Sequence, residues 1–356
     1  MINFAVIGTG WITDSFIQSA HATKSWKLSA VYSRKEATAK EFGAKYDVTT
    51  VHTTLGSLAN DASIAVVYIA SPNSLHYSHA KEILSAKKHV ILEKPATSTV
   101  AEFEEIYALA KEKGVFLIEA NRHIQEANFK ILQKNLSRLG HVYGASLTYA
   151  SYSSRYNNVL AGEVPNIFNL DYSGGCLVDI GVYPLNFAVA LLGKPKSQTY
   201  KPVITKTGAD GGGFVVLNYD SFGVQINQSK CYSSTAPSEV YGEKGTISVN
   251  ATTDIERISF LDAKTKKTEE LAQKKAEFNL MEEAAEFARI IEQGDKEAAQ
   301  KLEEMSRIVI GITTDLRTQN GIVFGVEKEG QSNSQSGVKT DEEPVVDAPE
   351  VGAGAS

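Results

Sequence analysis

The chain has 356 residues, of which 42% are hydrophobic and 22% are charged, a composition typical of a soluble globular protein with room for two domains. The longest unbroken apolar run, residues 64–70, has seven residues, whereas a membrane-spanning helix needs about 20. The formal charge of −6 is small, and no block of lysines or arginines occurs, which argues against nucleic acid or a membrane as partner and favours a small molecule.

The N-terminus and the cysteines indicate the cellular compartment in which the protein works. The chain starts with a strand-like run at residues 4–7 and lacks the basic segment and long apolar core of a signal peptide. Cys176 and Cys231 show neither CxxC spacing nor a disulfide framework. Both observations predict a cytoplasmic protein.

Short apolar runs alternate with helical periods over the first 120 residues. The strand-like runs, rich in β-branched and aromatic residues, are 4–7, 28–32, 64–70, 89–92 and 115–119. One of the helical segments between them follows Thr99, a predicted N-cap with Glu102 three residues on. Near-continuous apolar strands separated by helices predict a parallel sheet covered on both faces.

The first predicted strand is followed by Gly8-Thr9-Gly10-Trp11-Ile12-Thr13, in the position of a dinucleotide-binding fingerprint. Gly8 permits the tight turn, and Gly10 lets the backbone approach a pyrophosphate at the positive end of the following helix. The third position of the motif is Thr13 instead of Gly or Ala, so an ordinary strand-to-helix turn is the alternative. We expect a nucleotide because the turn opens a strand-and-helix alternation.

The end of the second predicted strand bears on the choice of dinucleotide. An acid there would bind the ribose hydroxyls of NAD, whereas small polar and Arg side chains suit the 2′-phosphate of NADP. The strand ends in Ser33-Arg34-Lys35, with no acid before Glu36. We therefore expect NADP, with NAD as the alternative, and we expect Ser33 and Arg34 to bind the phosphate. The competing interpretation makes Arg34 a solvated residue at the start of a helix.

After about Arg122 the pattern changes to that of an α+β domain. The predicted elements are a helix at 127–138, a strand at 141–153, an irregular stretch to about 172, an apolar helix ending at Gly193, strands with tight turns over 202–261, and helices at 279–293 and about 297–319. Asp220 and Ser221 are predicted to connect a hairpin. Such a domain would contain a large, mostly antiparallel open sheet with helices on one side.

The acidity of the chain is concentrated at its C-terminal end. From Lys328 onward, two lysines face six acids, a net charge of −4, which leaves −2 for the remaining 327 residues. This stretch has only isolated valines among polar residues, too little apolar surface to offset the entropy of ordering. We expect a dinucleotide-binding domain at 1–121, a substrate-binding and oligomerisation domain at 122–327, and a disordered acidic tail at 328–356, for which an interaction segment is the alternative.

Two further segments make the pattern specific. Glu93-Lys94-Pro95 closes a predicted strand, and a GGCLVDIGVYP segment at 174–184 opens the apolar helix. Together with the glycine loop, SPNSLH at 71–76 and EANRH at 119–123, they resemble the Gfo/Idh/MocA family of NAD(P)-dependent oxidoreductases over residues 2 to about 324. The resemblance implies an N-terminal Rossmann domain followed by an α+β domain, and a homodimer or homotetramer.

The resemblance also implies site residues. Lys94, Asp179 and Tyr183 would form the active site, Glu93 would contact the nicotinamide ribose, and His123 would lie near the nicotinamide or substrate. The cofactor-binding residues that we expect are Gly8, Gly10, Trp11, Ile12, Ser33, Arg34, Ser71, Asn73, His76, Glu93, Lys94 and Arg122. Many members have His where this chain has Tyr183. That departure is similar to the glucose-fructose oxidoreductase and dimeric dihydrodiol dehydrogenase branch, and it makes inositol a less expected substrate.

The chemistry of the three active-site residues is intelligible from their side chains. Oxidation of an alcohol releases a hydride and a proton, and a tyrosine with an ordinary pKa of about 10 needs a nearby ammonium to favour its phenolate. Lys94 can supply that charge and donate a hydrogen bond to the substrate oxygen. Asp179, one helical turn before Tyr183, is assigned to orienting the substrate hydroxyl or Lys94. The alternatives are that Lys94 merely ends a strand and that Asp179 caps the next helix.

The sequence therefore predicts an NADP-dependent oxidoreductase that transfers a hydride between nicotinamide and a sugar or polyol-type alcohol or carbonyl, with Lys94 and Tyr183 as the acid/base pair. A non-catalytic, dinucleotide-sensing regulatory protein of the same fold and a glycosidase that uses NAD transiently are the alternatives. His76 and His79 have the spacing of a metal pair, but without an HExxH motif or a cysteine cluster we expect no metal.

Overall fold

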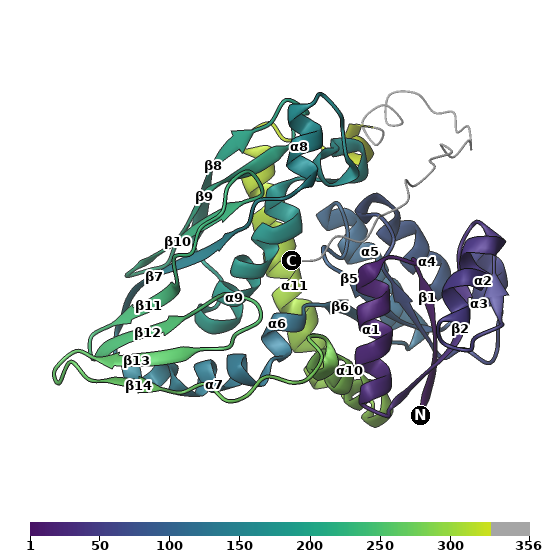
Figure 1. Cartoon of the computed structure of the whole chain (residues 1–356), viewed down its shortest axis with the longest axis horizontal. Coiled ribbons are helices and arrows are strands. Elements are labelled where there is room, and N and C mark those ends of the chain that lie inside the picture. The colour runs from purple at the N-terminus through teal and green to yellow at the C-terminus, as the bar shows by residue number, and fades with distance from the viewer. Residues whose placement is uncertain (329–356) are drawn as a thin grey trace.

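A six-stranded parallel sheet forms the first domain of the computed structural model, which describes residues 1–328 (Figure 1). Its strands are β1 (Ile2–Ile7), β2 (Trp26–Tyr32), β3 (Val51–His52), β4 (Val66–Ile69), β5 (His89–Glu93) and β6 (Leu117–Ala120). They lie in the order β3-β2-β1-β4-β5-β6. The prediction of parallel pairing is confirmed. The strand order reverses between β1 and β4, so the loops after these strands diverge to opposite faces.

Helices cover both faces of this sheet, because its strands are apolar on both sides. They are α1 (Trp11–Ala22), α2 (Glu36–Ala44), α3 (Leu55–Ala59), α4 (His76–Ser85) and α5 (Val100–Lys113). Phe16 of α1 stacks on Tyr68 of β4 on one face, whereas Ile83 and Phe103 pack against the other. The predicted cap of α5 is confirmed, because Thr99 forms a capping box with Glu102.

The second domain is built on an eight-stranded mixed sheet, seen to the left in Figure 1. Its strands are β7 (Val142–Ala150), β8 (Ser197–Ile204), β9 (Asp210–Asn218), β10 (Gly223–Ser229), β11 (Ser238–Gly242), β12 (Gly245–Val249), β13 (Ile258–Asp262) and β14 (Thr268–Glu270), in the order β14-β13-β12-β11-β7-β10-β9-β8. Within the described residues, β7 and β10 pair in parallel and the other neighbours are antiparallel. The predicted hairpin is confirmed, with Asn218 opposite Gly223.

One face of this sheet is covered by helices. Leu147 and Val215 of the sheet pack with Leu185 of α9 (Val182–Leu192) and Val309 of α11 (Lys296–Thr318) in one apolar core. In Figure 1, α7 (Ala127–Asn135) lies at the lower end of this domain and α8 (Arg155–Leu160) at its upper end, while the short helix α6 (Arg122–Gln125) lies on the side of the first domain. The stretch predicted to be irregular therefore contains a helix, α8.

The prediction that both C-terminal helices would cover the second sheet is wrong for α10 (Met281–Gln293). Phe287 of α10 lies in the same apolar core as Phe4 of the first domain. The indole of Trp26 donates a hydrogen bond of 2.9 Å to the carbonyl oxygen of Ala284. An apolar stripe identifies the buried face of a helix but not the surface that covers it, and for α10 that surface is α1 and β2.

Among residues 1–328, the segment Leu170–Leu192 has a mean hydropathy of 1.7 and is long and apolar enough to cross a membrane by length and composition. Because 72% of its apolar window is buried inside the protein, it has the environment of a core helix. The predicted acidic tail lies outside the described residues except for Lys328.

Candidate active site

A cavity of about 190 Å³ lies at the C-terminal ends of β1, β4 and β5. This edge of the sheet, beside the reversal of strand order, is where parallel α/β folds bind ligands. One wall comes from the first domain and the other from the second. The lining residues are Trp11, Ile12, Ala70, Ser71, Asn73, His76, Glu93, Lys94, Asp179 and Tyr183, of which all but Ala70 were predicted as site residues.

The glycine turn after β1 leaves room for a dinucleotide. Gly8 has φ +110°, and a Cβ there would lie 2.5 Å from the carbonyl oxygen of Ala70, so another residue would not fit. A Cβ on Gly10 would meet nothing within 4 Å, which shows open space beside it. No side chain caps α1 at Gly10, so the first N–H groups of the helix remain available to a pyrophosphate. The turn therefore fits the predicted cofactor.

Ser33 and Arg34 follow β2 and do not line the cavity. Burial, and then the nearby His76 and Arg34, lower the pKa of His79 to about 4. His79 Nδ1 lies 3.1 Å from Ser71 Oγ, and Ser71 lines the cavity. Arg34 is thus close to the same edge of the sheet as the cavity, where the ribose of a dinucleotide would extend.

His76 braces two loops of the site. Its ring nitrogens lie 2.8 Å from the carbonyl oxygens of Pro95 and Ser71, which belong to the loops after β5 and β4. Burial lowers the pKa of His76 to about 4, so the ring is neutral near pH 7 and donates to one of the two oxygens. His76 therefore lines the cavity with both ring nitrogens turned to the backbone. Among residues 1–328, no group of three or more His, Cys, Asp or Glu could hold a metal ion.

Lys94, Asp179 and Tyr183 are brought together by the structure. The Lys94 ammonium donates hydrogen bonds to the carbonyl oxygen of Asp179, at 2.7 Å, and to its carboxylate Oδ1, at 3.1 Å. The same nitrogen lies 4.9 Å from the centre of the Tyr183 ring. Lys94 comes from the first domain and the other two residues from the second, so the three meet at the interface between domains.

Asp179 lies inside a π-helical turn, Leu177–Gly181, that leads into α9. The alternative that Asp179 caps the next helix is therefore wrong, because its carboxylate faces Lys94 instead of free N–H groups. Such π turns are frequent at functional sites. The start of the turn is fixed by the buried Asp210 of β9, which accepts hydrogen bonds of 2.7 Å from the backbone N–H of Leu177 and the hydroxyl of Tyr200.

Aromatic and imidazole rings enclose Tyr183. The ring centre of His123 lies 5.1 Å from that of Tyr183, and the ring centre of Tyr149 lies 5.5 Å from it, both edge to face. Burial, and then the charge of Arg122, lower the pKa of His123 to about 3. His123 is therefore a neutral wall beside Tyr183.

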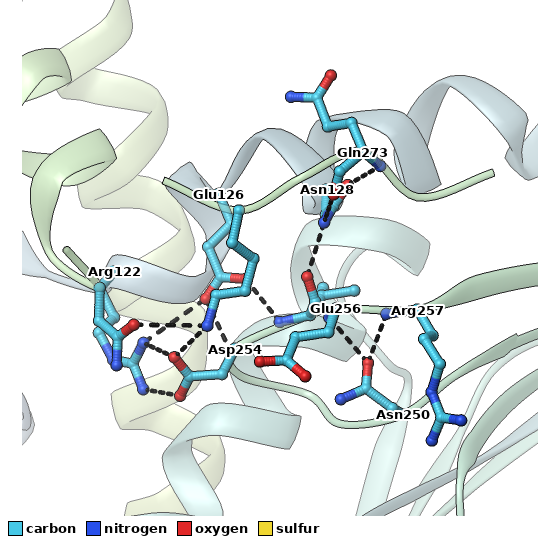
Figure 2. A network of polar contacts seen from close by, with 11 residues as sticks. Arg122, Glu126, Asn128, Asn250, Asp254, Glu256, Arg257 and Gln273 are labelled. Atoms are coloured by element: carbon cyan, nitrogen blue, oxygen red, sulfur yellow. Dashed lines mark hydrogen bonds and ion pairs between the residues drawn. The ribbon is translucent and has the colours of Figure 1, made fainter. Parts of the chain in front are cut away.

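Arg122 differs from its expected role in binding cofactor, as Figure 2 shows. Its guanidinium does not line the cavity but donates to both carboxylate oxygens of Asp254, at 3.0 and 2.5 Å. The Lys275 ammonium donates to the same carboxylate at 2.9 Å. Burial raises the pKa of Asp254, but the hydrogen bonds and charges of Arg122 and Lys275 outweigh burial and lower it to about 2. Arg122 thus anchors the β12–β13 loop beside the site.

Glu93, which lines the cavity, and Glu283 of α10 are two buried acids. The Glu93 carboxylate accepts a hydrogen bond of 2.5 Å from the Tyr68 hydroxyl and one of 3.3 Å from the backbone N–H of Lys94. Burial raises its pKa. Glu283, which the sequence did not indicate, is buried, and no described residue bonds its carboxyl oxygens. Burial, and then the charge of Glu93, raise the pKa of Glu283 well above its ordinary value.

Lys230 is the most consequential residue that the sequence did not reveal. It follows β10, and its ammonium donates to Oδ2 of Asp179, opposite the oxygen that Lys94 contacts. The sequence places it at the end of a strand, outside any motif. Its contact with the site becomes visible only when the second sheet is folded against the π turn.

Comparison with known proteins agrees with this architecture. Residues 2–120 match the GFO_IDH_MocA family model, described as an oxidoreductase family with an NAD-binding Rossmann fold, and residues 136–248 match the GFO/IDH/MocA C-terminal domain. Among solved structures, KijD10, a 3-ketoreductase from Actinomadura kijaniata in complex with NADP and TDP-benzene, has a TM-score of 0.76 with 21% identity, over 89% of this chain and 97% of that chain.

Full-length relatives are also found. The chain is 38% identical over 328 residues to scyllo-inositol 2-dehydrogenase (NADP(+)) IolU of Bacillus subtilis, covering 92% of this chain and 100% of IolU. It is 37% identical over 324 residues to the uncharacterized oxidoreductase YgjR of Escherichia coli, covering 91% of this chain and 98% of YgjR. Mouse trans-1,2-dihydrobenzene-1,2-diol dehydrogenase is 28% identical over 68% of this chain and 73% of its own length. By both domains and by similarity along nearly its whole length, the chain belongs to the Gfo/Idh/MocA family of oxidoreductases.

Proposed function

We propose that this protein is an NADP-dependent oxidoreductase that transfers a hydride between nicotinamide and a sugar or polyol-type alcohol or carbonyl. The observation that carries the proposal is the meeting of Lys94, Asp179 and Tyr183 at the wall of a cavity whose opposite wall is the glycine turn. A protein that only senses the dinucleotide needs the cofactor wall, but it has no need of a lysine held by a carboxylate over a tyrosine ring.

In the proposed mechanism Tyr183 exchanges the proton and Lys94 supplies positive charge. When bound, the cofactor would accept the hydride as NADP⁺ or supply it as NADPH. During oxidation the substrate O–H gives its proton to Tyr183, and during reduction Tyr183 returns a proton to the carbonyl oxygen. The Lys94 ammonium stabilises negative charge on the phenolic and substrate oxygens, while Asp179 holds that ammonium in place.

Ser33 and Arg34 support NADP over NAD. Their side chains suit a 2′-phosphate, and β2 ends without the acid that would bind free ribose hydroxyls. The relative IolU is named for NADP(+), and KijD10 was solved with NADP. We place the reaction in the cytoplasm, because NADP and the two unpaired cysteines are compatible with a reducing compartment.

The substrate is proposed only as a class. The name of IolU makes scyllo-inositol a substrate to test, although Tyr183 favours other polyols and sugars. The names of mouse dihydrodiol dehydrogenase and of the 3-ketoreductase KijD10 widen the set to cyclic diols and ketones. These names share a carbon bearing a hydroxyl or ketone.

We also propose that the protein pairs with a second copy through the outer face of its large sheet. Residues whose side chains alternate with the buried core positions of β9 and β13 remain exposed there, among them Phe214, Val216 and Leu261. Exposed apolar side chains on a continuous sheet face are typical of subunit interfaces. Light scattering after size exclusion would give the mass in solution, and a monomer at micromolar concentration would contradict this pairing.

The activity is tested by following NADPH oxidation or NADP reduction over aldoses, ketoses, dicarbonyls, inositols and their keto forms. Lys94→Ala and Tyr183→Phe should each lower kcat by a factor of about 100 or more, because proton transfer and charge stabilisation act in the transition state. NADPH affinity, read from NADPH fluorescence, should change little in Tyr183→Phe.

A matched control exists on α4, where the Lys81 ammonium lies 5.2 Å from the ring centre of Tyr77. Lys81→Ala and Tyr77→Phe remove a similar pair outside the site and should leave kcat unchanged. Tight NADPH binding without turnover of any substrate would instead favour the sensing protein.

A further inference from the structure

Lys230 contacts Asp179, one of the three residues that we propose to act in the reaction. Its side chain is only 7% exposed, and its ammonium holds Oδ2 of Asp179 while the Lys94 ammonium holds Oδ1. A single carboxylate therefore binds two ammonium groups, one on each oxygen. Burying a lysine is costly unless its charge is paired, so this contact accounts for how Lys230 is tolerated there.

The backbone of Lys230 is fixed on both sides. Its N–H donates a hydrogen bond of 2.8 Å to the carbonyl oxygen of Gly211 in β9, and its carbonyl oxygen accepts one of 2.9 Å from the N–H of Ser153 after β7. The residue thus bridges the ends of two strands that flank β10. These two backbone hydrogen bonds fix the position of Lys230 in the sheet, next to Asp179. A lysine on an exposed loop would not be held in this way.

We propose that Lys230 is a positioning residue for the reaction, which fixes the Asp179 carboxylate so that Asp179 in turn holds the Lys94 ammonium over Tyr183. This inference rests on the proposed function, because it requires Lys94 and Tyr183 to carry the proton chemistry. The second ammonium also sets the charge of the site. Lys94 and Asp179 alone sum to zero, whereas with Lys230 the three groups carry +1, which suits negative charge developing on the substrate oxygen.

The charge of Lys230 depends on the groups that face it. These are Asp179 from the π turn, Lys94 from the end of β5, Cys176 from the start of the turn and Cys231 next in the chain. Burial, and then the ammonium of Lys94, lower the pKa of Lys230 to about 8, while the charges of Cys176 and Cys231 oppose this shift. Lys230 therefore loses its proton at a lower pH than a solvated lysine does.

Two variants separate the charge of Lys230 from its bulk. Lys230→Met keeps the length without the charge and should lower kcat tenfold or more while the Kd of NADPH stays within twofold. Lys230→Arg keeps a charge and should recover most of kcat. The fall in wild-type kcat on the alkaline side should move to higher pH in Lys230→Arg, because guanidinium keeps its proton.

Lys88→Met is the matched control. Lys88 is also buried, but it donates to the backbone oxygens of Asp61 and Ile64, at 2.6 and 2.7 Å, away from the cavity. This variant should lower the melting temperature and leave kcat and its pH profile unchanged. If Lys230→Met matched Lys88→Met in both respects, Lys230 would be a structural residue only and the inference would be overturned.

A measurement without turnover tests the pairing itself. In protein labelled with ¹³C at lysine Cε, the resonance that disappears in Lys230→Met should titrate, and its midpoint should fall in Asp179→Asn, because the carboxylate that favours the ammonium is gone. An unchanged midpoint would overturn the inference. Turnover that needs Lys94 and Tyr183 but not Lys230 overturns this inference alone, whereas no turnover by the wild-type protein overturns the proposed function and the inference with it.

Discussion

At the scale of single residues, Arg34 provides the sharpest test of cofactor choice. A charged hydrogen bond to phosphate contributes about 1.5–3 kcal/mol, so Arg34→Ala should raise the Kd of NADPH by about 10- to 100-fold and leave that of NADH nearly unchanged. Fluorescence titration measures both constants. Lys27→Ala, at the other end of β2, removes an exposed charge as a control and should alter neither. Equal losses for the two nucleotides in Arg34→Ala would contradict the phosphate assignment.

His123 predicts how stability depends on pH. The unfolded chain protonates this histidine near its ordinary pKa of 6.5, whereas the folded protein keeps it neutral down to about 3. Below pH 6.5 the unfolded state therefore binds more protons, and stability is lost as the pH falls. At pH 5 the contribution of one such group is about 2 kcal/mol.

His123→Phe should accordingly lose less stability than the wild type between pH 7 and pH 5, by about 2 kcal/mol, in urea unfolding. His76 and His79, whose pKa values are lowered to about 4, act in the same direction and stay in the variant, so part of the acid sensitivity should persist. Identical pH dependence in the two proteins would show that the pKa of His123 is the same in the folded and unfolded states.

Motif residues could be predicted, but their supporting partners could not. Lys94, Asp179 and Tyr183 stand in recognisable segments, so the sequence identifies them, and the structure brings them together. Lys230 lies 51 residues from Asp179, and Asp254 lies 132 residues from Arg122. Such contacts depend on which strands pair and which loops meet, and no local pattern records that.

At the scale of elements, the start of α5 offers a test of local structure. The Thr99 hydroxyl accepts from the backbone N–H of Glu102 at 3.2 Å, and the Glu102 carboxylate accepts from the N–H of Thr99 at 3.1 Å. Thr99→Ala removes the first bond and should lower the free energy of unfolding by about 1 kcal/mol. Thr99→Ser keeps a hydroxyl and should remain near the wild type in urea unfolding, and equal losses in both variants would contradict a capping role.

The strands and helices show which structural features the hydrophobic periodicity of the sequence can predict and which it cannot. The strands of the first sheet are near-continuous apolar runs, which the sequence displays directly, although the two-residue β3 is too short to leave a pattern. The sequence predicted the apolar face of α10, but it did not predict that this face packs against the first domain. The parallel pairing of β7 with β10, inside a mostly antiparallel sheet, joins strands far apart in the chain and depends on the tertiary fold.

At the scale of the whole molecule, α11 couples the two domains. Met305 belongs to the core of the second sheet, whereas Ile310, less than two turns later, belongs to a core of the first. Near its end, Arg317 reaches the carbonyl oxygen of Ser98, and Ser98 Oγ lies 2.6 Å from Ser173 Oγ across the domain boundary. Separate unfolding of one domain would expose apolar surface on α11.

We therefore expect calorimetry to show one cooperative unfolding transition. NADPH should raise the midpoint temperature of this single transition. At a ligand concentration of 100 times Kd the added stability is about 2.7 kcal/mol. A calorimetric enthalpy equal to the van't Hoff enthalpy would support the coupling. Two transitions, of which NADPH shifts only the first domain's, would contradict it.

The proposed acid/base pair is divided between the two domains, and this division has a consequence for how such enzymes diversify. Lys94 and the glycine turn come from the segment before α6, whereas Asp179, Tyr183 and Lys230 come from the segment after it. A crossover between genes near the junction of β6 and α6 would keep the nucleotide preference of one parent and take the substrate preference of the other. The chimeric protein would be active only if the aspartate of the π turn from one parent contacts the lysine at the end of β5 from the other parent.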